Sequence, residues 1–260
     1  MKFAFSTLGV PGTSVPEVAA LAVSTGWHGV ELRAHPEEPV NPTMGMRERA
    51  AVVDEFARAG VEIVTVAGYA QVAAAGDEAA IGEELAELVR LAGDLGASFV
   101  RVFPGGGDQS RETADATAAR RLAAAAETAA DLGVRILLET HDSHRTGTAV
   151  SRVVGRVGHK HVGAMWDVLH PWLEEEPPVT THAALGPYLG CVQVKDVASA
   201  EDLTPLPLGG GILPLGECLA LADDDGWVCW EYEKRWYPDA AELPGILEAG
   251  REHLESLVRS

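Results

Sequence analysis

The segment ADATAARRLAAAAETAADLGVRILLETHD, Ala114 to Asp142, contains one full repeat of the pattern that decides the fold. Its alanine-rich first part is typical of a helix, and Gly133 stands where a helix C-terminus commonly has glycine. An apolar, strand-like run follows and leads directly into the polar residues Glu139 to Asp142. Helix, glycine, strand and polar strand end therefore follow one another in one short stretch.

The same unit recurs along the whole chain. The predicted strands are 2–6 (KFAFS), 29–33 (GVELR), 62–67 (EIVTVA), 98–104 (SFVRVFP), 134–140 (VRILLET), 161–168 (HVGAMWDV), 191–197 (CVQVKDV) and 227–233 (WVCWEYE). The clearest predicted helices between them are 15–26, 82–96 and 114–133, the last two closing at Gly96 and Gly133. Eight alternating strand–helix units predict a parallel sheet closed into a single (β/α)₈ TIM barrel, with residues 1–260 as one domain.

An open doubly wound sheet is the competing architecture. It would carry a G-x-G-x-x-G fingerprint after its first strand, and the segment STLGVPGTS lacks that spacing. The glycine run that begins at Gly105 follows the fourth predicted strand, where we expect a flexible loop rather than a phosphate-binding cradle.

Composition excludes several classes of partner. The formal net charge of -19 opposes binding to nucleic acid, because such surfaces need clustered Lys and Arg. No run approaches the roughly 18 apolar residues of a membrane helix, and the N-terminus lacks signal-peptide features, so we expect a cytoplasmic protein with no membrane partner. Cys191, Cys218 and Cys229 form no metal or disulfide pattern and are expected to be reduced core residues.

Polar residues at the ends of the last four strands carry the chemistry. In such barrels the active site lies at the carboxyl ends of the strands. The oxygen-bearing side chains there are Glu139, Asp167, Gln193 and Glu231. A buried carboxylate requires a cation or a hydrogen-bonding partner, and oxygen ligands suit Mn²⁺ or Mg²⁺, with Co²⁺ or another divalent ion as alternatives. In the seventh strand, Gln193 would face the barrel mouth while its neighbours Val192 and Val194 face the helices.

The segments GWHGVELR, LGASFVRVFPGG, ILLET, WDVLH and VKDV, in this order, resemble the recurrent phrases of the xylose-isomerase-like TIM barrels. This superfamily includes sugar isomerases and epimerases, dehydratases and apurinic endonucleases, and the resemblance covers essentially the whole chain. It implies that the four strand-end residues bind the metal, with Glu139 and Glu231 as proton acceptor and donor. Gln193 departs from the histidine of most epimerase-like members, and hydroxypyruvate isomerase is similar in using glutamine there.

The resemblance implies a divalent-metal-dependent isomerase or epimerase acting on a small keto sugar or hydroxy-keto acid through an enediolate. A lyase or dehydratase on the same scaffold is the alternative, since it begins with the same proton transfer. An endonuclease is disfavoured, because Ala67 and Phe103 stand where those enzymes place zinc-binding histidines on the third and fourth strands. A metal-binding protein without catalysis is a further alternative. A homo-oligomer is compatible with the sequence.

Other side chains are candidates for binding substrate. His170 follows Asp167 in the D-x-x-H arrangement with which family members orient substrate, and the alternative is a surface-loop histidine before Pro171. Lys195 shares the parity of Gln193, and the alternative for it is a salt bridge to Asp196 or Glu231. The remaining candidates are His141, Arg101, Arg235 and Tyr69, and internal ion pairs or loop packing are the alternative interpretations.

Overall fold

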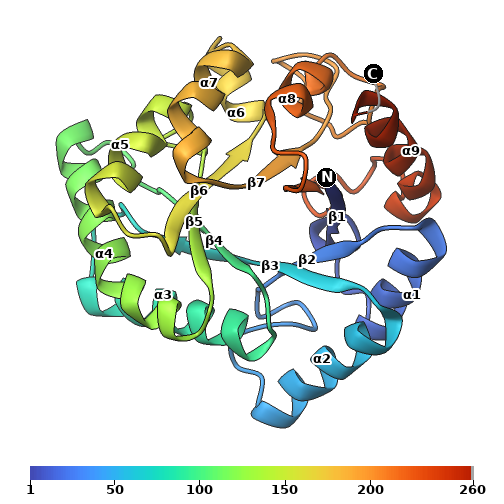
Figure 1. The fold of residues 1–260 in the computed structure, drawn as a ribbon, viewed down its shortest axis with the longest axis horizontal. Coiled ribbons are helices and arrows are strands. Elements are labelled where there is room, and N and C mark those ends of the chain that lie inside the picture. The colour runs from blue at the N-terminus through green and yellow to red at the C-terminus, as the bar shows by residue number, and fades with distance from the viewer. Residues whose placement is uncertain (259–260) are drawn as a thin grey trace.

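A computed structural model describes residues 1–258 as a closed barrel of eight parallel strands (Figure 1). The strands are β1 Lys2–Ser6, β2 Gly29–Arg33, β3 Glu62–Gln71, β4 Phe99–Phe103, β5 Arg135–Glu139, β6 Val162–Asp167, β7 Leu189–Val194 and β8 Trp227–Trp230. Each strand pairs in parallel with the next, and β8 pairs with β1 from Lys2–Trp227 to Phe5–Trp230, which closes the ring. The predicted (β/α)₈ TIM barrel is confirmed.

Helices surround the strands as an outer ring (Figure 1). They are α1 Val15–Thr25, α2 Met46–Ala59, α3 Glu78–Asp94, α4 Arg111–Asp131, α5 Gly147–Val157, α6 Leu169–Leu173, α7 Pro178–Leu185, α8 Leu215–Leu221 and α9 Leu247–Val258. The last helix returns to the first part of the chain, where the Trp27 indole N–H donates to the Leu247 carbonyl oxygen at 3.2 Å. The two ends of the chain thus meet in one ring.

Helix ends follow the local sequence. Ser110 precedes α4 and its hydroxyl accepts a hydrogen bond from the Thr113 backbone N–H, which satisfies one of the free donors of the first turn. Gly96 and Gly133 follow α3 and α4 with φ angles of +67° and +71°, a left-handed conformation that favours glycine. The two glycines predicted at helix ends therefore turn the chain into β4 and β5.

The barrel interior is apolar at one level and polar at the next. A small internal cluster is formed by Ala4, Val64, Leu137, Met165, Cys191 and Cys229. In β5 to β8, four of these residues are each followed two positions later, on the same face of the strand, by Glu139, Asp167, Gln193 and Glu231. The neighbours Val192 and Val194 belong instead to the larger core between the sheet and the helices. The barrel thus places a polar layer directly beyond its apolar plug.

Some strand bounds differ from those expected. The third strand is longer than predicted, and β7 and β8 are shorter, so that Lys195 and Glu231 are the first residues after their strands. The Glu231 backbone N–H still donates to the Val194 carbonyl oxygen at 3.0 Å, which keeps this residue in line with the sheet. Beyond it the chain turns away, with the Lys234 ammonium bound to the carbonyl oxygens of Pro238 and Ala240.

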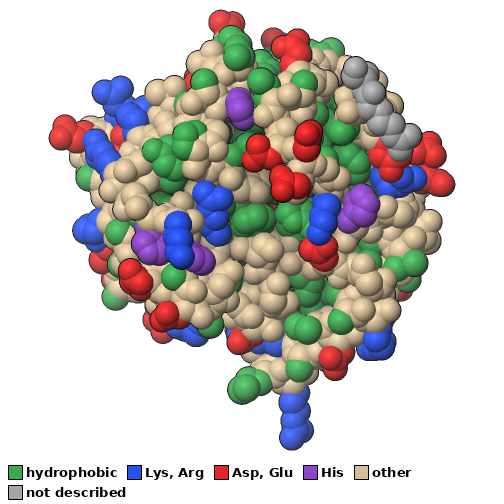
Figure 2. All heavy atoms as spheres, in the orientation of Figure 1, with side chains coloured by type: hydrophobic (Ala, Val, Ile, Leu, Met, Phe, Trp, Pro, Cys, Tyr) green, Lys and Arg blue, Asp and Glu red, His purple; other side chains and the backbone are tan. Residues whose placement is uncertain are grey.

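The outer surface carries charges of both signs. On the face shown in Figure 2, acidic and basic side chains are interspersed, with apolar side chains scattered among them. Among residues 1–258, no helix combines the length and the apolar character needed to cross a bilayer. The three cysteines are buried and unpaired, as the sequence predicts.

Candidate functional site

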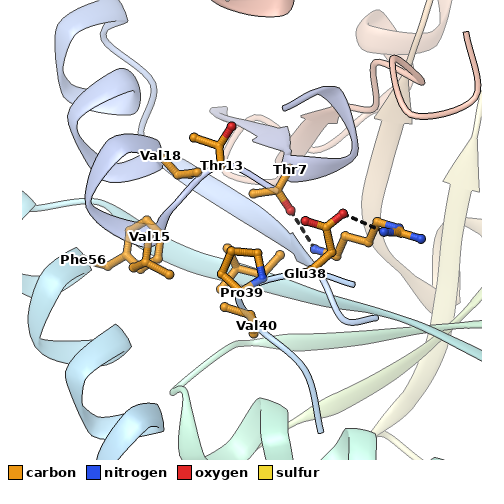
Figure 3. Close-up of a pocket in the computed structure, with 10 residues that line it drawn as sticks. Thr7, Thr13, Val15, Val18, Glu38, Pro39, Val40 and Phe56 are labelled. Atoms are coloured by element: carbon orange, nitrogen blue, oxygen red, sulfur yellow. Dashed lines mark hydrogen bonds and ion pairs between the residues drawn. The ribbon is translucent and has the colours of Figure 1, made fainter. Parts of the chain in front are cut away.

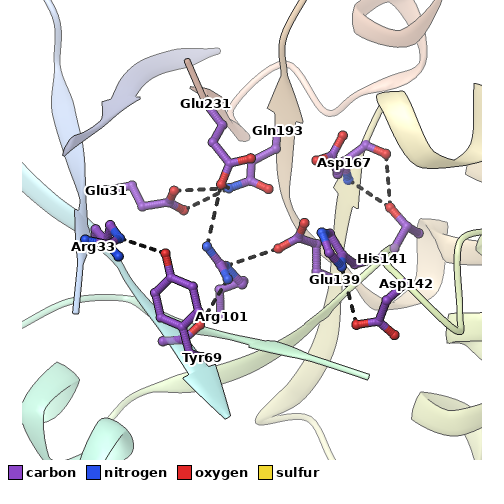
Figure 4. Close-up of polar contacts among 12 residues, drawn as sticks. Glu31, Arg33, Tyr69, Arg101, Glu139, His141, Asp142, Asp167, Gln193 and Glu231 are labelled. Atoms are coloured by element: carbon purple, nitrogen blue, oxygen red, sulfur yellow. Dashed lines mark hydrogen bonds and ion pairs between the residues drawn. The ribbon is translucent and has the colours of Figure 1, made fainter. Parts of the chain in front are cut away.

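The four strand-end residues singled out in the sequence come together at the mouth of the barrel (Figure 4). Glu139 and Asp167 are the last residues of β5 and β6, and Asp167 is the register partner of Gln193 in β7. Glu231 follows β8 directly. All four side chains are buried, with Gln193 and Asp167 completely inaccessible. The folded chain therefore places them where solvent cannot stabilise a charge.

Three of these residues form a compact group, which we term the carboxylate cluster: Glu139, Asp167 and Glu231. One oxygen of each lies within 4.8 Å of an oxygen of both others. The Gln193 amide nitrogen donates to Glu231 Oε1 at 3.3 Å, which attaches the fourth residue to the cluster. Like charges at this separation repel strongly in a buried site, so the cluster requires compensating positive charge.

Arg101, from β4, supplies part of that charge. Its guanidinium Nε lies 3.1 Å from Glu139 Oε2, and Nη2 lies 3.5 Å from Glu231 Oε1. The same side chain donates from Nη1 to the Gly68 carbonyl oxygen at 3.0 Å and lies over the Phe103 ring, 4.0 Å from its centroid. Arg101 is therefore held from both sides. It forms an internal ion pair, which is the alternative interpretation that the sequence analysis gives for this residue.

Lys195 supplies the second positive charge. Its ammonium lies 2.8 Å from Asp167 Oδ2 and 2.5 Å from Glu231 Oε2, and it also reaches Glu233 Oε1 at 2.7 Å. The alternative interpretation of a salt bridge to Glu231 is thus confirmed, whereas Asp196 is not its partner. The Asp196 carboxylate instead accepts backbone N–H groups of the following loop.

Glu31, from β2, adds a further buried carboxylate. The Gln193 amide nitrogen donates to both of its oxygens, at 3.0 and 3.2 Å. The fully buried or nearly buried charged groups that meet here are Glu31, Glu139, Asp167, Glu231, Arg101 and Lys195. Four carboxylates and two cations leave a formal excess of two negative charges, which matches the charge of one divalent cation.

The pKa values reflect this excess of negative charge. Burial, together with the nearby charge of Glu231, raises the pKa of Glu31 to about 7. Burial likewise raises the pKa of Glu139 and of Asp167 above their usual values. Burial also acts on Glu231, but its two neighbouring cations, Lys195 foremost, outweigh that effect and hold its pKa at about 2. Without a further cation, the folded protein therefore favours protons on part of this site.

Unpartnered oxygens indicate where a cation fits. Gln193 Oε1 is buried and has no hydrogen-bond partner among the described residues, and Glu139 Oε2 and Asp167 Oδ2 accept no hydrogen bond there either, although each faces a cationic side chain. A buried polar atom left without a partner costs about 1–3 kcal/mol. Carboxylate and amide oxygens are the ligands that Mg²⁺ and Mn²⁺ prefer. The donor set and its charge thus fit a divalent cation.

Two histidines lie beside the cluster. His141 follows β5 by two residues, and His170 belongs to α6, with ring centroids 4.3 Å apart. His170 Nε2 lies 3.8 Å from Asp167 Oδ2, and its Nδ1 is a buried atom without a hydrogen-bond partner in the described structure. Burial and then the neighbouring His141 lower the pKa of His170 to about 2, so this imidazole is neutral. Glu139 and the two imidazoles lie close enough to act on one small molecule.

Aromatic rings continue this wall around the mouth. Phe103 lies 4.4 Å from the His141 ring, centroid to centroid, and Tyr69 lies 5.8 Å from Phe103. The Tyr69 hydroxyl accepts a hydrogen bond from Arg33 Nε at 2.7 Å, which fixes the ring beside Arg101 (Figure 4). Tyr69 therefore lies at the barrel mouth, as the sequence predicts for a pocket wall.

The candidate Arg235 and several other charged or aromatic groups lie outside this arrangement. Arg235 forms an ion pair with the exposed Glu37, and the ring of Trp236 is half exposed. Trp172 lines a separate surface pocket together with Pro177. A small, largely apolar pocket beside β2 is lined in part by Arg33 and Glu38, which form a buried ion pair with Nη1 2.6 Å from Oε1 (Figure 3). Among the described residues, none of these groups contacts the carboxylate cluster, so we assign none of them to it.

Some supporting residues were not predicted. Asp142 holds His141 Nδ1 at 3.3 Å and accepts the Gly105 backbone N–H at 2.8 Å. Ser143 likewise accepts the Gly106 backbone N–H at 2.8 Å, so two backbone donors of the glycine loop are occupied by protein. The only signal for Asp142 in the sequence is its place just after a strand end. Its partner, a loop of the preceding unit, is visible only in the folded barrel.

Comparisons with known proteins agree with this geometry. The model of the xylose isomerase-like TIM barrel family matches residues 19–257. A 3-dehydroshikimate dehydratase of Bacillus anthracis is 24% identical over 195 residues, covering 73% of this chain and 69% of that protein. The structure of D-psicose 3-epimerase from Clostridium cellulolyticum with D-tagatose has a TM-score of 0.84 at 16% identity and covers 99% of both chains. The structure of the IolI protein with a bound zinc atom has a TM-score of 0.82 at 17% identity, over 99% of this chain and 98% of that one.

Proposed function

This chain belongs to the xylose isomerase-like TIM barrel family, and on that basis we propose that it is a divalent-metal-dependent enzyme that removes a proton beside the carbonyl group of a small hydroxylated ketone. One observation carries the proposal: a buried group of four carboxylates and one unpartnered amide oxygen has only two protein cations to balance it. Stability alone would favour apolar residues at these positions, because burying unbalanced charge is costly. The arrangement is suited to binding and chemistry.

The residues that would hold the cation are Glu139, Asp167, Gln193 and Glu231. A divalent cation bound there, Mn²⁺ or Mg²⁺ by the nature of its ligands, would draw electron density from the substrate carbonyl and make the adjacent carbon more acidic. The protein contributes a site closed to solvent at the level of the cluster, where electrostatic interactions are strong.

Glu139 is the proton acceptor in this proposal. Its carboxylate contacts one cationic side chain, Arg101, and burial raises its pKa, which makes it a stronger base than an exposed carboxylate. Glu231 is more constrained, because Lys195, Arg101 and Gln193 all contact it. The two glutamates are therefore unequal. Glu139 is the stronger base, and Glu231 holds its neighbours in place and is the second acid–base residue.

Dehydration is the outcome that we favour. Glu139 takes the proton from carbon, the bond between the next carbon and its hydroxyl breaks, and water leaves with a proton from an imidazole. His141, whose Nδ1 lies 3.3 Å from Asp142 Oδ2, supplies that proton beside Glu139, and the neutral His170 next to it binds a substrate hydroxyl through its unpartnered Nδ1. After the product leaves, the proton on Glu139 passes to the nearby imidazole of His141, which restores both groups. The curated dehydratase relative makes 3-dehydroshikimate the first substrate to test.

Isomerisation or epimerisation begins with the same proton transfer and is the second candidate. The near-complete structural overlap with a D-psicose 3-epimerase supports this second candidate. In that case the proton returns to carbon, and no oxygen is lost.

One experiment distinguishes these outcomes. The protein is incubated with Mn²⁺ or Mg²⁺ in D₂O with 3-dehydroshikimate, ketoses and keto-inositols, and the products are followed by NMR. Loss of water indicates the dehydratase, and deuterium at carbon with all oxygens retained indicates the isomerase or epimerase.

Two variants test the acid–base residues. Glu139→Gln and Glu231→Gln should lower the rate by about 10²–10⁴-fold, the usual worth of a positioned acid or base. The control is Glu127→Gln, since Glu127 is exposed on α4 and pairs there with His159. Wild-type rates in both glutamine variants would refute the assignment.

A further inference from the structure

We infer that Glu31 is a positioning residue, which sets the orientation of the Gln193 amide and thereby makes glutamine a metal ligand at this site. The inference rests on the proposed cation site and adds a residue from the opposite half of the chain to it. Glu31 lies in β2 and Gln193 in β7, and both side chains are completely inaccessible to solvent.

The contacts around the amide are one-sided. Its nitrogen donates to both Glu31 oxygens, at 3.0 and 3.2 Å, and to Glu231 Oε1 at 3.3 Å. Its oxygen has no hydrogen-bond partner among the described residues. Figure 4 shows the nitrogen of Gln193 turned toward Glu31 and the oxygen turned to the other side.

The chemistry of the two groups explains this orientation. An ionised carboxylate only accepts hydrogen bonds, and an amide has a donating and an accepting end. A divalent cation in the cluster favours the ionised form of Glu31, and this form selects the amide nitrogen and excludes the amide oxygen from its own side. Rotation of the amide by half a turn would place oxygen against oxygen at both Glu31 and Glu231.

Glu31 is itself fixed in place. Its β1 register partner, Ser6, forms a side-chain hydrogen bond with its carboxylate, and the charge of Arg101 lies nearby. The chain of contacts from Ser6 through Glu31 to Gln193 thus links strands β1, β2 and β7 across the barrel. A ligand held by such a second contact loses metal affinity when that contact is removed, commonly by about 10–100-fold.

The test compares two variants that lose the same charge. Glu31→Gln keeps an oxygen that can accept from the Gln193 amide, whereas Glu31→Leu has a similar size and no acceptor. Binding of Mn²⁺ alone to the metal-free protein is measured by calorimetry and by the EPR signal of free Mn²⁺. We expect the Kd of Glu31→Leu to be at least tenfold higher than that of Glu31→Gln. A matched control is Glu38→Gln, since Glu38 is also buried near β2 but pairs with Arg33.

The outcomes separate the inference from the proposed function. Equal weakening of Mn²⁺ binding in Glu31→Gln and Glu31→Leu would mean that Glu31 acts through its charge alone, and would overturn the inference. Wild-type affinity in both variants would overturn it as well, while leaving the metal site intact. Failure of the wild-type protein to bind Mn²⁺ would instead refute the proposed function. Circular dichroism confirms that each variant is folded.

Discussion

At the scale of single residues, Lys195 shows how a protein cation balances part of the negative charge of the site. Its ammonium lies within 2.8 Å of carboxylate oxygens on Asp167, Glu231 and Glu233. The ammonium is nearly inaccessible, and its pKa is raised well above the usual value, because these charges outweigh the effect of burial. Lys195 is therefore a fixed positive charge, and its removal leaves the carboxylates around it uncompensated.

Lys195→Met should destabilise the metal-free protein. Breaking a buried ion pair from one side typically costs about 3–5 kcal/mol. We expect a loss of this size in the free energy of unfolding, measured by urea denaturation in EDTA, and partial recovery in excess Mn²⁺. Lys160→Met is the matched control, because Lys160 is exposed. A change below about 1 kcal/mol would show that the ammonium is not needed for balance.

His144 gives the protein a predictable response to pH. It is buried between Asp115 Oδ1, 2.9 Å from Nε2, and Ser143 Oγ, 2.9 Å from Nδ1. Burial lowers its pKa below the usual 6.5, and Asp115 only partly opposes this. The unfolded chain therefore takes up a proton at this histidine near pH 6.5 while the folded chain does not, so stability falls as the pH falls below that value.

His144→Gln removes this titration. We expect the difference in free energy of unfolding between wild type and variant to narrow from pH 8 to pH 5, by at most about 1.4 kcal/mol per pH unit. Urea denaturation at several pH values measures it. A difference that stays constant across this range would contradict the low pKa in the folded state.

The positions of the site residues were predictable where they depend on strand order alone. Glu139, Asp167, Gln193 and Glu231 meet at one end because parallel strands end at one rim. The contact between Glu31 and Gln193 was not predictable, because it joins two strands, β2 and β7, that are not neighbours in the ring. Such a contact depends on the closure and stagger of the barrel and on side-chain lengths, which a single strand does not encode.

At the scale of elements, strand existence was predictable and strand ends were not. All eight strand segments in the sequence became strands, since each combines an apolar run with flanking turn residues. The end of β8 differs from expectation because Glu231 keeps one backbone bond to β7 while the chain beyond it turns outward. The outer face of β8 is determined by a helix, as Trp230 packs against α9.

Gly250 tests this contact between β8 and α9, and Gly82, a glycine in another helix, is its control. A Cβ atom at Gly250 would lie 2.2 Å from the Trp230 ring, so Gly250→Ala should destabilise the protein by about 1–3 kcal/mol. A Cβ at Gly82, in α3, would have no neighbour within 4 Å, so Gly82→Ala should stabilise it by about 0.5–1 kcal/mol. Chemical denaturation compares the two. Equal effects would mean that Trp230 moves freely to accommodate the methyl group.

At the scale of the whole molecule, the site lies where distant parts of the chain converge. Its residues come from β2, from β4 to β6 and from the ends of β7 and β8, which together span most of the ring. The ring itself closes only when β1 and β8 pair. A cation in the cluster would therefore bind the folded barrel and have no preformed site in the unfolded chain.

This linkage predicts a shift in thermal stability. At Mn²⁺ concentrations 100 times its Kd, the free energy of unfolding should rise by about 2.7 kcal/mol. For a chain of this length, that corresponds to an increase in Tm of roughly 5–10 °C, which EDTA should reverse. Calorimetry or the circular dichroism signal measures the Tm.

Asp167→Asn should abolish most of the shift, because the neutral amide weakens a ligand at the centre of the cluster, and Glu127→Gln should retain it. An identical Tm in Mn²⁺ and in EDTA would mean that no metal balances the excess negative charge in the barrel. Protons on carboxylates such as Glu31 and Glu139, whose pKa values are raised, would then balance it.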